Sequence, residues 1–290
     1  PLATGSQLRL GWPARHLAWR RAPRIPLRPA RRILKDYLSD HPSDGGVAVL
    51  LQCLTDRLAP EIAVATVRLL EFAGQRVVIP HKQHCCGLPA LDAGERDLAR
   101  EMAKQTIETF EHQPTVVTAA ASCAIAVRYD YPTLLAGEPE WAARASALAA
   151  KTWDLASYLD SSKGIKPGSL PTRDRPDVVV HRFCQSTNVV GLSDRVDRLI
   201  STLTGRAPVA LPDAGACCGF GGSTSVVAPE VSKALLDRKL DSIDQSGARI
   251  VVTDNPGCLL HLRGGAAARG QDIDVIHFAE LLAKHLPRRD

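Results

Sequence analysis

The alternation of apolar runs and amphipathic stretches in this chain follows one pattern twice. In the first part, short apolar runs are separated by segments whose apolar residues recur at helical spacing. Such alternation predicts a small parallel sheet flanked by helices. The pattern predicts strands at 47–51, 76–79 and 115–118, and helices at 60–72, 95–111 and 138–159.

The pattern restarts after residues 163–176, which are rich in Pro, Gly, Lys and Arg and are typical of a linker. The second part predicts strands at 177–180, 208–211, 249–253 and 273–276, and helices at 194–204, 229–246 and up to 286. We therefore expect an α/β protein with two tandem duplicated three-layer lobes, related by a pseudo-twofold axis. The expected domains are 46–162 and 177–290.

Charge and composition set the N-terminus apart from this repeat. Residues 1–35 contain eight Arg, one Lys and no acidic residue, whereas the rest of the chain is slightly acidic. We expect residues 1–45 to form a basic, disordered extension. With aromatic residues at only 4% of the chain, a nucleic-acid binder built on base stacking is disfavoured.

The sequence also contains no apolar run of the roughly 18–20 residues that a membrane span needs. It shows no clear signal peptide, so we expect a cytoplasmic protein whose thiols stay reduced.

All eight cysteines fall into two matching sets. The first set is Cys53, Cys85, Cys86 and Cys123, and the second is Cys184, Cys217, Cys218 and Cys258. Corresponding members lie 131 to 135 residues apart, which marks an internal repeat. Every cysteine follows a predicted strand. Because open parallel sheets bind ligands beyond the carboxyl ends of their strands, each set is expected to gather at such an edge.

Three interpretations of the cysteines compete. Disulfides are opposed by a reducing compartment and by the strain of bridging adjacent cysteines. Buried apolar cysteines do not explain two Cys-Cys-Gly turns at equivalent places. Metal binding explains both, because thiolates are soft ligands that select zinc or iron–sulfur species. Gly87 and Gly219 then allow the backbone to turn tightly beside a metal.

Zinc remains an alternative to iron at one of the two sets. Structural zinc sites usually place paired cysteines two to four residues apart, and this chain lacks such pairs. Adjacent cysteines suit two metals of one cluster better than one tetrahedral ion. We therefore favour an iron–sulfur cluster of the 4Fe-4S type at each set.

Two histidines and a glycine-rich loop are further candidates. His84 precedes Cys85 and is expected either in solvent or as a hydrogen-bond donor to cluster sulfur. His261 lies one helical turn after Cys258 and is a candidate replacement ligand. The loop at 219–222 lacks the third glycine of a dinucleotide-binding motif, so we assign it to a tight turn.

These motifs resemble the duplicated cysteine-rich CCG domain family. The matching segments are Cys53-Leu-Thr-Asp-Arg-Leu-Ala-Pro-Glu61, His84-Cys-Cys-Gly-Leu-Pro89, Ser122-Cys-Ala124, Ala216-Cys-Cys-Gly-Phe-Gly-Gly222 and Pro256-Gly-Cys-Leu259. The family includes the cysteine-rich subunit of heterodisulfide reductase, the glycolate oxidase iron–sulfur subunit and the lactate-utilisation iron–sulfur proteins, and the last branch is the most similar. The resemblance covers residues 46–286.

The resemblance implies a cytoplasmic iron–sulfur oxidoreductase subunit that transfers electrons with two partner subunits, one of them ferredoxin-like. Together they would oxidise L-lactate to pyruvate, with the eight cysteines holding the clusters. Alternatives within the family are a thiol–disulfide reductase and a glycolate oxidase subunit. A further hypothesis is a zinc-stabilised interaction subunit without redox activity. The sequence does not identify a catalytic residue in this chain.

The chain departs from the wider family at three places. Each half ends in a single cysteine, in Cys123-Ala-Ile-Ala126 and Cys258-Leu-Leu-His261, where relatives have Cys-x-x-Cys. The lactate branch tends to lack this last thiol as well. The second half begins with Cys184-Gln185 in place of Cys-His.

Overall fold

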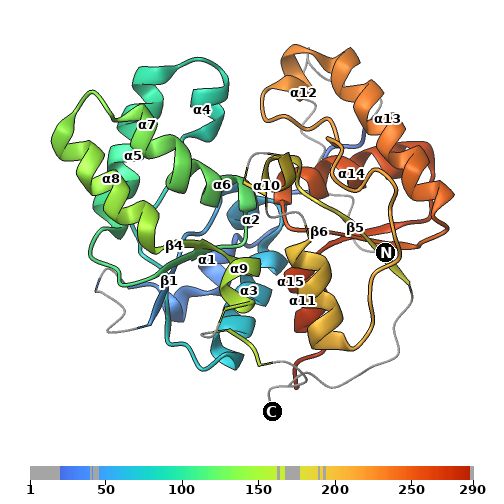
Figure 1. Ribbon diagram of the computed structural model, residues 1–290, viewed down its shortest axis with the longest axis horizontal. Helices are drawn as coiled ribbons and strands as arrows, with labels where there is room; N and C mark the ends of the chain where they lie inside the picture. The colour runs from blue at the N-terminus through green and yellow to red at the C-terminus, as the bar shows by residue number, and fades with distance from the viewer. Residues whose placement is uncertain are drawn as a thin grey trace.

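The computed structural model shows two α/β lobes side by side, the first coloured blue to green and the second yellow to red (Figure 1). The structure describes residues 20–39, 41, 46–161, 164–166, 177–188, 190–191 and 194–287. Within these ranges, no helix is long and apolar enough to cross a membrane.

The first lobe contains a four-stranded parallel sheet with the order β2-β1-β3-β4. Its strands are β1 (Val47–Val49), β2 (Val77–Val78), β3 (Val116–Thr118) and β4 (Thr152–Asp154). The fourth strand corrects the prediction of one helix over 138–159. That stretch is helix α8 (Pro139–Lys151), strand β4 and helix α9 (Leu155–Leu159). Asp154 starts the second helix because its carboxylate accepts a hydrogen bond from the Ser157 amide at 2.9 Å.

The second lobe repeats this sheet, but one of the four strands is shortened to a single bridge. Its parallel strands, in the order β5-β6-β7, are β5 (Val178–His181), β6 (Ile250–Thr253) and β7 (Asp274–His277). The strand predicted at 208–211 is only a single parallel bridge between Val209 and Val179. This bridge lies on the side of β5 that corresponds to the place of β2 beside β1.

Helices cover both faces of the first sheet, as the three-layer prediction requires. Val47 and Val49 of β1 pack in the core shared with α3 (Pro60–Phe72) and α9. Ala48, which points to the opposite face, packs with α5 (Arg96–Phe110) and α8. This alternation follows from the two-residue period of a strand.

The remaining helices are shorter or belong to the second lobe. In the first lobe they are α1 (Ala30–Ile33), η2 (Lys35–Tyr37), α2 (Cys53–Arg57), α4 (Leu88–Asp92), α6 (Ala121–Ile125), the π-helical η3 (Ala126–Asp130) and α7 (Tyr131–Leu134). In the second lobe they are α10 (Cys184–Asn188), α11 (Arg195–Thr204), α12 (Thr224–Val227), α13 (Pro229–Gln245), α14 (Pro256–Arg269) and α15 (Phe278–Ala283).

The contacts between the lobes are reciprocal, which confirms the pseudo-twofold relation. Helix α3 packs on α15, and their counterparts α11 and α9 pack on each other (Figure 1). Likewise α2 contacts α14 while the corresponding α10 contacts α6. Because one apolar cluster runs from α3 through α15 to β5 and β6, the lobes share a core rather than meeting at a polar surface.

Residues 20–39 differ from the expected disordered extension. Ala30 and Leu34 are buried, Leu38 forms a bridge with Ile79, and the Arg21 amide donates to the Gly264 carbonyl at 2.9 Å. The segment therefore contacts both lobes. The side chains of Arg20 and Arg31 find acceptors on the protein, which composition alone did not indicate. Residues 1–19, 40 and 42–45 of the predicted extension lie outside the described residues.

Candidate metal centres

The two cysteine sets occupy equivalent places at the carboxyl ends of the strands. Cys53 and Cys184 are the first residues of α2 and α10, four residues after β1 and three after β5. Cys123 and Cys258 each lie five residues beyond the last residue of β3 and β6. The burial also repeats. The first two cysteines of each set, Cys53 and Cys85 or Cys184 and Cys217, are half-buried, and the other two are buried.

The structure brings all four thiols of the first set together. The Cys86 thiol donates to the Cys123 Sγ at 3.2 Å, and both residues are buried. Cys85 hydrogen-bonds with Cys53 and with Cys86, so the four sulfur atoms form a continuous chain of contacts. These sulfurs come from positions up to about 70 residues apart in sequence, and the parallel sheet accounts for their convergence.

The second set forms the same chain of contacts. Cys217 hydrogen-bonds with Cys184 and Cys218, and Cys218 with Cys258. The Gly219 amide donates to the Cys217 Sγ at 3.3 Å. In each set the turn after the cysteine pair therefore directs a backbone N–H at a sulfur, since Gly87 does the same for Cys85.

The crowding of sulfurs favours a thiolate in each set. Hydrogen bonds from Cys53 and Cys86 lower the pKa of the Cys85 thiol to about 2. Hydrogen bonds from Cys184 and Cys218 lower the pKa of the Cys217 thiol to about 2 in the same way. Clustered, partly buried sulfur anions need a positive charge nearby, and a metal supplies one.

One buried histidine lies with the second set and was missed by the sequence analysis. His181 is the last residue of β5, and its side chain is fully buried. One of its ring nitrogens and the sulfurs of Cys218 and Cys258 all lie within 4.8 Å of one another, a grouping suited to a metal ion. Its position three residues before Cys184 was a usable signal, but only the sheet shows that the ring faces the sulfurs.

The histidines singled out from sequence have other partners. The His84 Nδ1 is 2.8 Å from the carbonyl oxygen of Cys85. The His261 Nδ1 accepts from Arg20 at 3.0 Å, and its Nε2 lies 3.5 Å from the Ser232 hydroxyl. The structure therefore does not place His261 among the sulfurs, and His181 is the histidine found there.

The Cys-Cys-Gly glycines are confirmed as tight turns. Gly87 has φ of +82° and Gly219 has φ of +90°, in the left-handed region that glycine tolerates. A Cβ on Gly219 would stand 2.3 Å from the backbone oxygen of Ser232 in α13. The turn can therefore approach the helix only because it carries no side chain. Gly221 and Gly222 also have positive φ, which agrees with the predicted tight turn.

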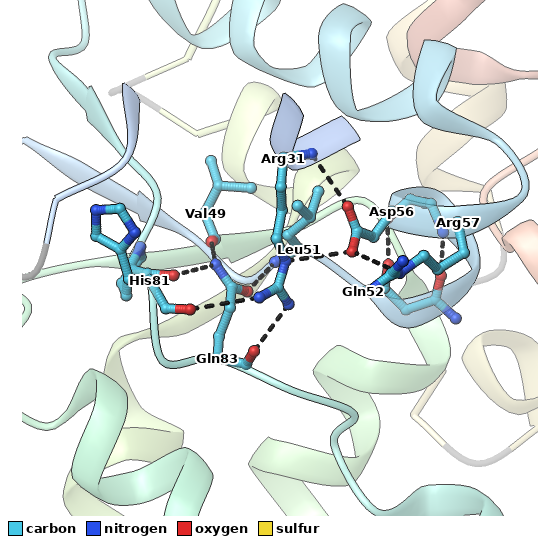
Figure 2. A network of polar contacts seen from close by, with 10 residues as sticks. Arg31, Val49, Leu51, Gln52, Asp56, Arg57, His81 and Gln83 are labelled. Carbon is cyan, nitrogen blue, oxygen red and sulfur yellow. Dashed lines mark hydrogen bonds and ion pairs between the residues drawn. The ribbon is translucent and has the colours of Figure 1, made fainter. Parts of the chain in front are cut away.

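A polar network fixes the loop that carries the first cysteine pair (Figure 2). Arg31 forms an ion pair with the buried Asp56 at 3.2 Å, and its guanidinium donates to the Gln83 carbonyl at 2.8 Å. The Gln83 side chain in turn accepts from the Leu51 amide at 2.6 Å and donates to the Val49 carbonyl at 3.3 Å. The segment before β1 thus ties α2 to the loop that precedes Cys85.

These donor sets fit metal or iron–sulfur binding. Each offers four convergent sulfurs, which is the chemistry that iron–sulfur clusters and zinc select. The buried ring of His181 adds a nitrogen donor at the second set. The role of the eight cysteines as ligands nevertheless stays a prediction from their chemistry and convergence.

The repeated fold and cysteine sets define a tandem cysteine-rich protein, and comparison identifies its family. The family model described as "CCG: Cysteine-rich domain" matches residues 47–128 and 178–263, one copy in each lobe. A lactate utilization protein A of Exiguobacterium sp. is 36% identical over 238 residues, covering 81% of this chain and 96% of the relative. That of Geobacillus kaustophilus is also 36% identical, with 81% and 98% covered. The chain belongs to the lactate utilization protein A family of cysteine-rich CCG proteins, as the sequence motifs indicated.

A solved structure shows a similar fold at low sequence identity. The crystal structure of a hypothetical protein from Helicobacter pylori aligns with a TM-score of 0.60 and 9% identity. The alignment covers 99% of this chain and 56% of that one. At this identity the similarity concerns the fold alone.

Proposed function

We propose that this chain is the iron–sulfur electron-transfer subunit of a cytoplasmic complex that oxidises L-lactate to pyruvate, with one 4Fe-4S cluster at each cysteine set. The observation that carries the proposal is the convergence of two matching four-cysteine sets, each at the carboxyl edge of a parallel sheet. Relatives named for lactate utilization supply the substrate class.

The proposed reaction is a two-electron oxidation. The C–H and O–H bonds at C2 of lactate break, a C=O bond forms, and two protons and two electrons leave. A partner subunit takes the electrons from lactate, and a ferredoxin-like partner is the oxidant that finally receives them. This chain connects the two partners. Iron bound at each set would accept and release one electron at a time, which thiols alone do not do at such a site.

The residues of the chain have two tasks in this proposal. Cys86, Cys123, Cys218 and Cys258 hold the inner side of each centre away from water. The half-buried Cys53, Cys85, Cys184 and Cys217 lie on the outer side, where a docked partner shortens the electron path. The amides of Gly87 and Gly219 direct partial positive charge at the sulfurs and stabilise the reduced state.

Anaerobic purification of the full chain tests the proposal. We expect a brown protein with broad visible absorbance, roughly eight iron atoms and eight acid-labile sulfides per chain, bleached by a reductant. With its partners it should transfer electrons on addition of L-lactate, and glycolate should not substitute. A colourless, zinc-loaded protein would support the interaction-subunit reading instead. Cleavage of a heterodisulfide by the isolated chain would support the thiol–disulfide reductase.

A further inference from the structure

We propose that His181 is a metal ligand of the second centre, where an imidazole nitrogen binds the metal together with the thiolates of Cys218 and Cys258. The inference rests on the proposed function, since it assumes that the second cysteine set holds a metal. It makes the two centres chemically unequal: the first has sulfur donors only, and the second has sulfur and nitrogen donors.

The burial of His181 is the first observation behind this proposal. The residue is 0% exposed, and neither ring nitrogen has a nitrogen or oxygen partner among the described residues. The polar group that the ring contacts is the Cys258 sulfur, and sulfur is a weak hydrogen-bond acceptor. A buried polar group without a strong partner is disfavoured. A metal that binds one ring nitrogen would remove much of this penalty.

The surroundings of the ring show where that metal would lie. The Cys218 and Cys258 sulfurs and the His181 nitrogen share a space in which the three atoms lie within 4.8 Å of one another. All three residues are buried. A metal about 2.0–2.3 Å from each donor brings donors to within about 4 Å of one another, so only a small closing movement would let these three atoms share an ion. Neutral imidazole and thiolate are both ordinary metal ligands.

Among the described residues, no nitrogen donor is grouped with the sulfurs of the first set in this way. The residue three positions before Cys53 is Leu50, which is buried and packs in the core that contains Cys86 and Cys123. Leu50 therefore occupies the position of His181 in the repeat. The chain itself thus shows that leucine is compatible with this fold beside a cysteine set.

A neutral nitrogen donor changes the electronic properties of the second centre. Replacing a thiolate with neutral imidazole lowers the negative charge around iron and raises its reduction potential, as in Rieske centres. The second centre is then the stronger electron acceptor. Electrons that enter at the first centre would then move to the second centre spontaneously, because the second has the higher reduction potential.

The experiment uses the full chain purified without oxygen and labelled with ¹⁵N-histidine, beside an unlabelled sample. Pulsed EPR of the wild type should show a histidine nitrogen coupled to one of the two centres. The coupling pattern should differ between the labelled and unlabelled samples, because ¹⁴N and ¹⁵N have different nuclear spins. His181→Leu should lose this coupling and lower the potential of the second centre, leaving the first unchanged. His181→Cys supplies a thiolate in place of the imidazole and should keep the metal without the nitrogen coupling.

His261→Leu is the matched control. It removes a buried histidine of the same lobe that lies three residues after Cys258 but is engaged by Arg20 and Ser232. We expect it to keep the nitrogen coupling. Circular dichroism on each variant establishes that the fold is retained. The reciprocal Leu50→His should introduce a second nitrogen coupling at the first centre.

The outcomes separate this inference from the proposed function. A metal-free wild type overturns the proposed function and the inference with it. A wild type that carries two iron–sulfur centres but shows no histidine coupling, or a His181→Leu variant that keeps it, overturns the inference alone. Zinc at the second set with nitrogen among its ligands, measured by X-ray absorption, supports His181 as a ligand while overturning iron at that set.

Discussion

The two lobes keep the same sulfur framework and differ in what surrounds it. Both sets have the same order of cysteines, the same burial and the same left-handed glycine. Beside them, the first lobe has Leu50 where the second has His181. The first lobe also holds its cysteine turn by a hydrogen bond from the Tyr131 hydroxyl to the Cys86 carbonyl at 2.7 Å. In the second, the Ser232 hydroxyl donates to the Gly219 carbonyl at 2.6 Å.

The comparison indicates that the duplicated geometry gathers the sulfurs, whereas the neighbouring side chains give each set different surroundings. Hydrogen bonds, burial and non-sulfur ligands tune a cluster more than the presence of four thiols does. The same contrast holds at the junction of the lobes. Asp154 ends β4 and His277 ends β7, and each caps the next helix with a different chemistry.

Removing one buried cysteine from each lobe is expected to have the largest effect. Cys86→Ser and Cys218→Ser replace a soft sulfur ligand with a hard oxygen. Each variant should lose roughly half of its iron and acid-labile sulfide, because the proposed function assigns one cluster to each set. Iron analysis and visible spectra provide the measurement. If either substitution empties both sets, the lobes share a single centre instead of holding one each.

Alanine substitutions at Gly87 and Gly219 test how closely each turn is packed against its neighbours. Both substitutions force a left-handed backbone on alanine, at a cost of about 1–2 kcal/mol. Gly219→Ala adds a Cβ 2.3 Å from a backbone oxygen, whereas Gly87→Ala adds one 3.0 Å from the Cβ of Met102. We expect Gly219→Ala to lose roughly 3–5 kcal/mol of unfolding free energy and Gly87→Ala about half of that. Equal losses in denaturant titrations would contradict the difference in packing.

The capping residue His277 predicts a pH dependence of the free energy of unfolding. Burial lowers the pKa of His277 to about 4. Its Nδ1 accepts from the Ala279 amide at 3.2 Å and its Nε2 donates to the Ala119 carbonyl at 2.9 Å, so the ring is held neutral. In the unfolded chain the ring binds a proton near pH 6.5. The stability that His277 contributes is therefore lost as pH falls from about 6.5 to 4, by about 3 kcal/mol at most.

A His277 variant separates the pH effect of this histidine from an opposing pH effect of Asp254. Burial, followed by repulsion from Asp154, raises the pKa of Asp254 to about 7. The folded state therefore holds a proton there that the unfolded state releases, and this contribution is lost as pH rises through the same range. His277→Gln leaves Asp254 in place but does not titrate. The wild type should be more stable than the variant at pH 7, and the gap should narrow towards pH 4. A gap independent of pH in urea titrations would rule out His277 as the titrating group.

Much of the fold followed from local patterns. The runs at 47–51 and 249–253 became strands β1 and β6 because short apolar stretches rich in β-branched residues suit a buried parallel strand. The repeat of the cysteines predicted two lobes, and the reciprocal helix contacts confirm it. Strand β4 was missed because three residues inside an Ala-rich helical stretch carry too weak a signal.

The parts that sequence did not reveal depend on tertiary contacts. His181 becomes a candidate ligand only once β5 and β6 lie side by side, which brings its ring to Cys258. His261 has the better sequence spacing, but the helix α14 turns its ring to Arg20. Residues 20–39 have the composition of a charged tail, and composition cannot show that Arg31 meets a buried carboxylate.

The smallest expected effect concerns this last contact, which supports the first lobe alone. Asp56 is buried and pairs with Arg31 at 3.2 Å and with the exposed Arg57 at 3.3 Å. Arg31→Ala leaves the carboxylate with the weaker partner and releases the Gln83 carbonyl, so we expect a loss of about 1–3 kcal/mol. Arg57→Ala, as the matched control, should cost less than about 1 kcal/mol because its side chain is 71% exposed.

Amide hydrogen exchange in Arg31→Ala tests whether the contact of Arg31 with Asp56 stabilises only the first lobe. In Arg31→Ala the amides around Cys85 should exchange faster, because the network of Figure 2 fixes the loop that leads to this cysteine. The amides around Cys217 should exchange as in the wild type, since that turn has its own support from Ser232. Equal acceleration in both turns would mean that Arg31 stabilises the shared core and not the first cysteine set.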